Sequence, residues 1–308
     1  MKLARWAFSA ALSASLLSPA LPASAYCLTR GCNENTQECA IDRQGCLTAG
    51  RLLHWSSLCL SFDVQQDGSA LRDIGYDQVR DSVHAAFRTW LNADCGDGQG
   101  PKVRIEDYGP VACRTAEYNQ KAGNANIVMF RDNSWPYDNA IDILALTTLI
   151  FNADTGEIYD ADIEVNSFQQ PMSVGAVSRS DIDFNSVITH EVGHFLGLSH
   201  SNVAGSTMRP SYVPGNTEMA SLEPDDVAGI CSALPPDRET ADDSCEPRHG
   251  FSAECAVEDN GCQLAPGRAG ALSGWLGALL AASSMLRWRL RRAARRRAAG
   301  PGPRRGPG

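Results

Sequence analysis

The sequence lacks several patterns that would place it in common classes of protein. No pair of cysteines combines with histidines at zinc-finger spacing, which argues against a structural Cys/His zinc finger. No segment has the spacing of an EF-hand calcium loop, and no long internal repeat is present. The apolar run at residues 271–286 is shorter than the roughly 20 residues that a membrane-spanning helix needs. The chain has 308 residues, enough for one substantial domain with additional segments.

Basic residues are scarce outside the carboxyl-terminal tail. The chain has 27 lysines and arginines against 36 acidic residues, and nine of the arginines lie after residue 286. The preceding part is therefore strongly acidic. We expect it to be repelled by nucleic acid, and its charge favours solubility.

The chain contains eleven cysteines. In an exported protein, cysteines mostly form disulfides. Cys262 lies beside the tail, and the other ten can form five bridges, whose pairing the sequence does not give.

Residues 1–25 have the pattern of a secretory signal peptide. Positive charges at Lys2 and Arg5 begin the segment, an apolar stretch follows at residues 6–17, and the small residues 23–25 offer a cleavage site. We therefore expect the protein to be exported, to the extracellular space or the cell surface.

The carboxyl terminus has an apolar segment at residues 266–290 and an arginine-rich tail at residues 291–308. Because flanking arginines can snorkel, the segment is predicted to hold the protein in a membrane, with the arginines in the cytoplasm. One alternative is a basic amphipathic or nucleic-acid-binding tail. Another is processing near Cys262, since Gly261-Cys262, a short apolar run and arginines resemble the sorting signals of some bacterial surface proteins, notably the myxobacterial type.

Three further parts lie between these ends. Residues 26–50 are rich in cysteine and poor in apolar residues, so their stability is expected to depend on bridges. Residues 51–234 contain the periodic segments of a folded domain, and residues 235–265 are predicted to form an acidic linker and a cysteine-bearing stalk. Within the domain, the spacing of apolar residues predicts a helix at 76–93. Strands are predicted at 57–64, 102–109, 124–131 and 140–151, and residues 153–166 are predicted to form a turn at Thr155-Gly156 that leads into a further strand.

The stretch "HEVGHFLGLSH" at residues 190–200 contains the candidate metal ligands and the candidate catalytic residue. Ser180 to Asp183 are helix-starting residues, so His190 and His194 should project from one face of a helix, as a pair of metal ligands requires. Gly197 suits the left-handed turn that ends a helix, and the turn can bring His200 to the same metal. Three imidazoles and a water form an open catalytic zinc site, in which Glu191 can take a proton from the water and return it to the leaving amine.

A second motif follows in "STMRPSY", residues 206–212. With the long histidine motif, Met208 resembles the methionine turn beneath the zinc of metzincin peptidases. Within that clan, the sequence most resembles the matrixin, or matrix-metalloproteinase-like, family, whose pattern is matched at Ser201, Pro210 and Tyr212. The resemblance implies that Pro210 and Tyr212 line the substrate pocket, although Tyr212 could instead stabilise the oxyanion, as a tyrosine does in some other metzincins.

The resemblance also implies the fold class. This is an α+β fold, with a twisted mixed sheet packed on long helices and an active-site helix followed by the methionine turn. The substrate would lie extended along an edge strand. Residues 145–151 are the candidate for this strand, with an ordinary core strand as the alternative. Asp225 and Asp226, just after Pro224, are predicted to start a last helix that runs through Ile230.

The sequence departs from the family pattern in two places. No histidine lies between His84 and His190, so we expect no second, structural zinc. The family's propeptide switch is also absent. A thiolate of Cys27, Cys32, Cys39 or Cys46 could still block the zinc, with plain disulfides as the alternative. Calcium is a candidate second ion at Asp154, Asp160, Asp162 and Glu164, with a solvated acidic face as the alternative.

These observations favour an exported, monomeric zinc endopeptidase that acts on protein or peptide substrates. His190, His194 and His200 would hold one zinc ion, and Glu191 would act as general base and acid. The competing hypothesis is a surface binding or adhesion module that keeps the zinc fold without catalysis. The intact Glu191 argues against it, because zinc held only for structure does not need that carboxylate.

Overall fold

The computed structural model describes residues 25–33, 38–138, 141–240 and 242–255. Their largest element is a mixed five-stranded sheet. The outer strand β7 runs antiparallel to its neighbour β8, and the remaining neighbours are parallel. In spatial order the strands are β5 (Arg104–Val111), β4 (Cys59–Gln65), β6 (Ile127–Phe130), β8 (Ile158–Val165) and β7 (Ala145–Phe151). Residues 145–151 are therefore an edge strand, which was one of the two alternatives that the sequence left open.

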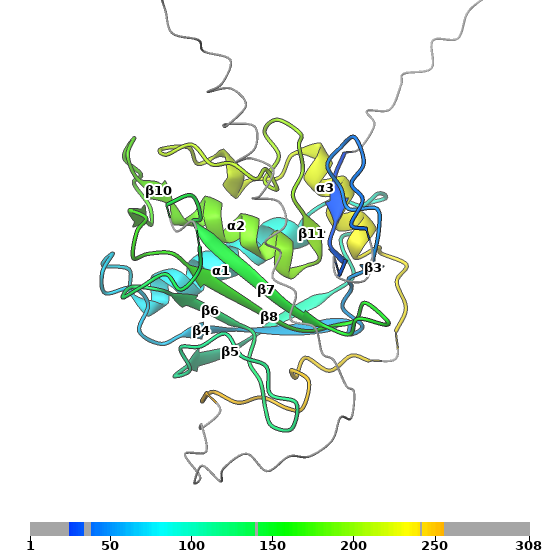
Figure 1. The fold of residues 1–308 in the computed structure, drawn as a ribbon, viewed down its shortest axis with the longest axis horizontal. Coiled ribbons are helices and arrows are strands. Elements are labelled where there is room, and N and C mark those ends of the chain that lie inside the picture. Colours follow the sequence, from blue (N-terminus) through cyan, green and yellow to red (C-terminus); the bar gives the residue numbers. More distant parts are fainter. Residues whose placement is uncertain (1–24, 34–37, 139–140, 241, 256–308) are drawn as a thin grey trace, which may run out of the picture.

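Two helices cover one face of this sheet (Figure 1). They are α1 (Tyr76–Leu91) and α2 (Phe184–Phe195). The buried residues of α1 recur at helical spacing and meet the apolar face of the sheet. Trp90 of α1 also donates a hydrogen bond from its indole nitrogen to the Thr189 carbonyl of α2 at 2.7 Å, which fixes the two helices together. The predicted α+β class with a mixed sheet on helices is confirmed.

Helix starts follow the predicted signals. Asp183 is the N-cap of α2, and its carboxylate accepts a hydrogen bond from the Ser186 amide at 2.9 Å. The last helix, α3 (Pro224–Ala233), has proline in its first turn and two acids that favour the positive end of the helix. It extends three residues beyond Ile230, the end that the sequence suggested.

The amino-terminal segment packs beside the end of α2. Strand β1 (Cys27–Leu28) pairs antiparallel with β11 (Leu198–Ser199), and β2 (Arg30–Gly31) pairs with β3 (Arg51–Leu52). Disulfides Cys27–Cys46 and Cys32–Cys39 close this segment, as its composition predicted. The remaining short elements are β9 (Met172–Ser173), β10 (Ile182–Asp183) and the 3-10 helix η1 (Glu218–Ala220).

Residues 242–255 do not project away from the domain as a stalk. They run along the sheet face opposite α1 and α2 (Figure 1). Disulfides Cys59–Cys245 and Cys113–Cys255 fasten them there, and the Ala112 amide donates to the Ala253 carbonyl at 2.8 Å. A fifth bridge, Cys95–Cys231, joins the segment after α1 to α3. The five predicted bridges are thus formed by the ten cysteines that precede Cys262.

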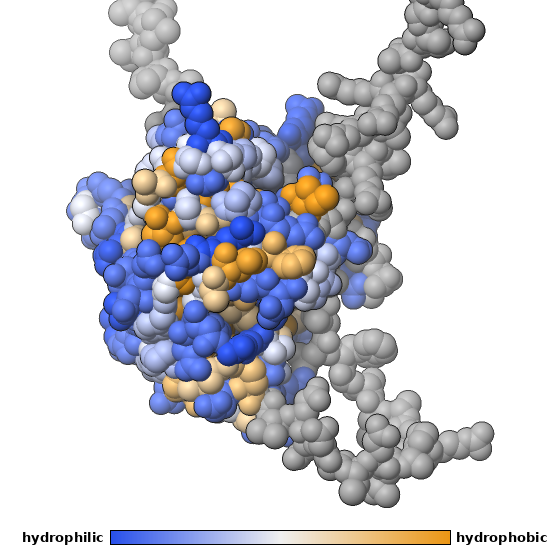
Figure 2. Space-filling view, turned by 90° about the vertical axis from the view of Figure 1, so that its left-hand side faces the viewer, coloured by the Kyte–Doolittle hydropathy of each residue, from blue (hydrophilic) through white to orange (hydrophobic). Residues whose placement is uncertain are grey.

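Two predicted segments lie outside the described residues. These are the signal peptide, apart from Ala25, and the apolar and arginine-rich carboxyl terminus with Cys262. Within the described part of the chain, no helix is long and apolar enough to cross a membrane. On the face seen in Figure 2, apolar residues form small patches in a largely hydrophilic surface, in keeping with the acidic composition.

Candidate active site

Helix α2 and the turn after it bring three histidines together. His190 and His194 lie one turn apart, and their Nε2 atoms are 3.1 Å from each other. Gly197 has φ of 101°, a conformation that side-chain-bearing residues rarely adopt, and it turns the chain toward His200. One ring nitrogen from each of the three histidines lies within 4.8 Å of the others. The predicted convergence of the three imidazoles is therefore present.

Backbone carbonyls orient two of these rings. His190 Nδ1 lies 2.7 Å from the Thr207 carbonyl oxygen, and His194 Nδ1 lies 2.9 Å from that of Leu198. Since a carbonyl can only accept, each Nδ1 carries the proton and each Nε2 presents a lone pair. Two lone pairs that face each other at 3.1 Å need a cation between or beside them. The donor set therefore fits a zinc ion held by three neutral imidazoles.

The surroundings keep these imidazoles neutral. Burial lowers the pKa of His194 to about 4, with a further contribution from His190. Burial also lowers the pKa of His190 and takes that of His200 well below its ordinary value. Neutral histidine is the form that binds a metal.

Glu191 lies beside this cluster and is only 6% exposed. Burial raises the pKa of its carboxyl group, while the nearby His194 and a hydrogen bond from Thr147 act in the opposite direction. The Thr147 hydroxyl donates to Glu191 Oε2 at 2.6 Å. A buried carboxylate next to three converging imidazoles is placed to exchange protons with a metal-bound water.

Met208 lies in a turn beneath α2 and is fully buried. A side chain at Gly193 would overlap the Met208 sulfur and lie 2.7 Å from Trp90, so the close packing of turn and helix requires glycine there. Ser201 joins the third histidine to this turn, since its amide donates to the Met208 carbonyl at 2.8 Å. Its hydroxyl donates to Asp225 at 2.7 Å.

The carboxylate of Asp226 holds the methionine turn. Oδ1 accepts from the Ser206 hydroxyl at 2.5 Å and the Met208 amide at 3.1 Å. Oδ2 accepts from the amides of Thr207 at 2.8 Å and Glu223 at 2.9 Å. Because the Thr207 carbonyl orients His190, this buried carboxylate supports the histidine cluster from behind.

Tyr212 has its hydroxyl group engaged in the loop that follows. The hydroxyl accepts from the Asp183 amide at 2.8 Å and donates to the Asn216 carbonyl at 2.5 Å. It therefore fixes the loop to the start of α2, an arrangement that suits a pocket wall better than an oxyanion donor. Pro210 is exposed on the same loop.

The four acids considered for calcium do not converge. Asp154 lies in the turn between β7 and β8, and Glu164 is paired with Arg131 and Tyr137. Asp160 and Asp162 share one face of β8, and burial raises the pKa of both well above the ordinary value. Repulsion by Asp162 adds to the effect at Asp160, and repulsion by Glu164 adds to it at Asp162. Among the described residues, no three of these acids offer ligand atoms that converge, so the set does not fit the six to eight oxygens that calcium takes.

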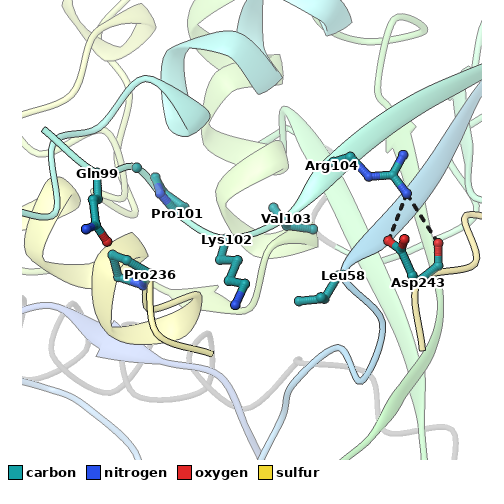
Figure 3. A pocket seen from close by; sticks show the side chains of 9 residues that line it. Leu58, Gln99, Pro101, Lys102, Val103, Arg104, Pro236 and Asp243 are labelled. Atoms are coloured by element: carbon teal, nitrogen blue, oxygen red, sulfur yellow. Dashed lines mark hydrogen bonds and ion pairs between the residues drawn. The ribbon is translucent and has the colours of Figure 1, made fainter. Parts of the chain in front are cut away.

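Other groups in the described residues are poorer candidates for a site. Two further clusters of potential ligands rest on Cys59–Cys245 and Cys113–Cys255, which are disulfide-bonded. A hollow of about 490 Å³ lies between the start of β5 and the residues Pro236 and Asp243 (Figure 3). Lys102 and an Arg104–Asp243 ion pair line it, and no histidine or paired acid does. The histidine cluster is the site with catalytic chemistry.

Sequence reasoning missed three contributors to this site. Thr147 and Asp226 reach it only through long-range packing, and Gly193, which lies within α2, has a role that shows only in its contacts with Met208 and Trp90. Asp226 was recognised as a helix-starting residue, and its second role could have been suspected only from its burial.

Comparison with known proteins identifies the family. The matrixin family profile matches residues 54–233, more than half of the chain. Matrilysin of Rattus norvegicus is 51% identical over 51 residues, which are 17% of this chain and 19% of that protein. Metalloendoproteinase 4-MMP of Arabidopsis thaliana is 34% identical over 132 residues, 42% of this chain and 33% of that protein.

Matrix metalloproteinase-C of Caenorhabditis elegans is 25% identical over 182 residues, which are 57% of this chain and 28% of that protein. The matches thus span a third or less of each of these relatives. Together with the histidine cluster and the mixed sheet packed on helices, the family profile shows that the chain belongs to the matrixin family.

Proposed function

We propose that this protein is an exported zinc endopeptidase. The observation that carries the proposal is the buried Glu191 carboxylate, held beside the converging imidazoles of His190, His194 and His200. A site that kept zinc only for structure would close its fourth position and would not need this carboxylate. Family membership supports the same activity.

Glu191 would perform the proton transfers. It takes a proton from the attacking water and returns it to the leaving amine, so one residue acts first as base and then as acid. A zinc ion bound by the three histidines would polarise the water and the scissile carbonyl. Met208 supports the site from below without contacting substrate.

The proposed substrate is an extended protein or peptide. Among the strands that the structure describes, β7 has a neighbour on one side only, and an extended backbone could add to its open edge next to α2 as a further strand. Pro210 and Tyr212 would form a wall of the side-chain pocket. The acidic charge favours a protein or peptide substrate over nucleic acid, and a monomeric enzyme is part of the proposal.

Export is part of the proposal. Five disulfides in the described residues suit an oxidising, extracellular environment. The signal peptide at 1–25 and the membrane segment at 266–290 stay predictions, as does cleavage near Cys262. Mass spectrometry of the mature carboxyl terminus would distinguish a retained segment from a processed one.

Restraint of the enzyme by a free cysteine is not part of the proposal. Cys27, Cys32, Cys39 and Cys46 are all disulfide-bonded, so none offers the thiolate that could block zinc. The alternative of plain disulfides in this segment is therefore the correct one. Calcium is also not part of the proposal, because Asp154, Asp160, Asp162 and Glu164 do not converge on one point.

The test is cleavage of a generic protein substrate by the purified full chain. We expect cleavage that a chelator abolishes and that added zinc restores. Zinc-loaded, folded protein that cleaves no member of a broad peptide library would instead support the binding module. The same preparation without chelator, incubated with inhibitors of serine and cysteine proteases, controls for contaminating activity.

A further inference from the structure

Thr147 lies where the edge strand of the sheet meets the active-site helix. It belongs to β7 and faces Ile163 of β8, whose side chain is in the core on the helix side. The neighbouring Thr148 faces Asp162 and therefore points to the opposite face, because successive strand residues alternate. One threonine of the pair thus meets α2, and the other does not.

The contact of Thr147 is specific. Its single hydroxyl hydrogen is directed to Glu191 Oε2 at 2.6 Å, while the Glu191 carbonyl oxygen is farther away at 3.3 Å. Within residues 25–33, 38–138, 141–240 and 242–255, no other side chain donates a hydrogen bond to this carboxylate.

A glutamate side chain has three rotatable bonds, so a base on such a chain samples several positions unless a partner holds it. A hydrogen bond to a charged group is among the stronger ones in proteins. We propose that Thr147 is a positioning residue for Glu191, and this inference rests on the proposed peptidase function. It adds that β7 contributes both the backbone edge for the substrate and the hydroxyl that orients the base.

The test compares variants of the full chain. Thr147→Val keeps the shape of the side chain and removes the hydroxyl, whereas Thr147→Ser keeps the hydroxyl. Thr148→Val is the matched control, because the Thr148 hydroxyl is buried on the other face and has no hydrogen-bond partner among the residues that the structure describes. For each variant, kcat, KM, zinc content and thermal stability are measured with one peptide substrate.

We expect kcat of Thr147→Val to fall about tenfold, the loss expected when a hydrogen bond to a charged group is removed from a reacting residue. KM should change less than about twofold and zinc content should not change. Thr147→Ser should recover most of the activity, and Thr148→Val should behave as wild type. Unchanged kcat in Thr147→Val, or an equal loss in Thr147→Ser, would overturn the inference.

A second measurement does not depend on activity. Crystal structures of the zinc-loaded wild type and Thr147→Val are compared at Glu191. We expect the carboxylate to be ordered in the wild type and displaced or spread over several positions in the variant. An identical Glu191 conformation in both would contradict the inference even if the wild type cleaved nothing, a result that by itself counts only against the proposed function.

Discussion

Replacing Asp226 by asparagine tests whether a single buried carboxylate supports the zinc site. Asp226 is 1% exposed and accepts four hydrogen bonds, two at each oxygen. Asparagine keeps the shape but offers only one oxygen. Its NH2 group must face one of the two pairs of donors, so two hydrogen bonds are lost. The NH2 group, itself a donor, then lies against those two donors.

The magnitude follows from these contacts. A hydrogen bond to a charged group is worth about 1.5–3 kcal/mol, so losing two gives a destabilisation of about 3–6 kcal/mol. For a domain of this size, 1 kcal/mol shifts Tm by about 2–4 °C, so we expect Tm to fall by about 10 °C. Zinc affinity should fall as well, since the Thr207 carbonyl that orients His190 belongs to the same turn.

Thermal unfolding followed by circular dichroism, and zinc competition with a chromophoric chelator, measure the two effects. Asp225→Asn is the control, because Asp225 is a partly exposed neighbour that has the same charge and accepts from Ser201. Its effect should be the smaller one. A Tm of Asp226→Asn within about 2 °C of wild type, with unchanged zinc affinity, would refute this account of the methionine turn.

Three other changes have distinct expected outcomes. Burial raises the pKa of Asp63 from 3.8 to about 8. Between these two pH values the carboxyl group is neutral in the folded protein and ionised in the unfolded chain, so the free energy of unfolding decreases as the pH rises. Asp63→Asn should therefore leave Tm nearly unchanged at pH 4 and raise it increasingly toward pH 8, and a difference independent of pH would contradict this. Gly193→Ala should overpack against Met208 and lower the free energy of unfolding, measured with urea, by about 1–3 kcal/mol. An unchanged midpoint would show that the methionine turn can move to accommodate the added methyl group. Replacing Cys27 and Cys46 together by serine should loosen β1 from β11 and weaken zinc retention against a chelator, whereas equal retention would mean that the segment does not support the third ligand.

Much of the site could be predicted because its chemistry is local in sequence. His190 and His194 are related by the periodicity of one helix, and Gly197 and His200 follow from the turn that ends it. The helix starts were predicted for the same reason, since capping at Asp183 depends only on neighbouring residues. The edge position of residues 145–151 came from the family resemblance, because periodicity alone does not order strands in a sheet.

The missed residues depend on contacts between distant parts of the chain. Thr147 is 44 residues from Glu191 and meets it only through the register of β7 on β8. Residues 235–265 were predicted as an acidic linker and a cysteine-bearing stalk, yet the Cys59–Cys245 bridge across 186 positions fastens residues 242–255 to the sheet. Composition does not reveal such pairing, and neither does spacing.

The central claim is that Glu191 performs the proton transfers at a zinc ion held by the three histidines. Glu191→Gln keeps the shape of the side chain and removes its basicity. Zinc content and cleavage of one peptide should be measured on the same preparation of this variant. The account predicts one equivalent of zinc and a loss of cleavage by at least a hundredfold, since general acid–base catalysis contributes about 10²–10⁴-fold. Cleavage at the wild-type rate by the zinc-loaded variant would contradict it.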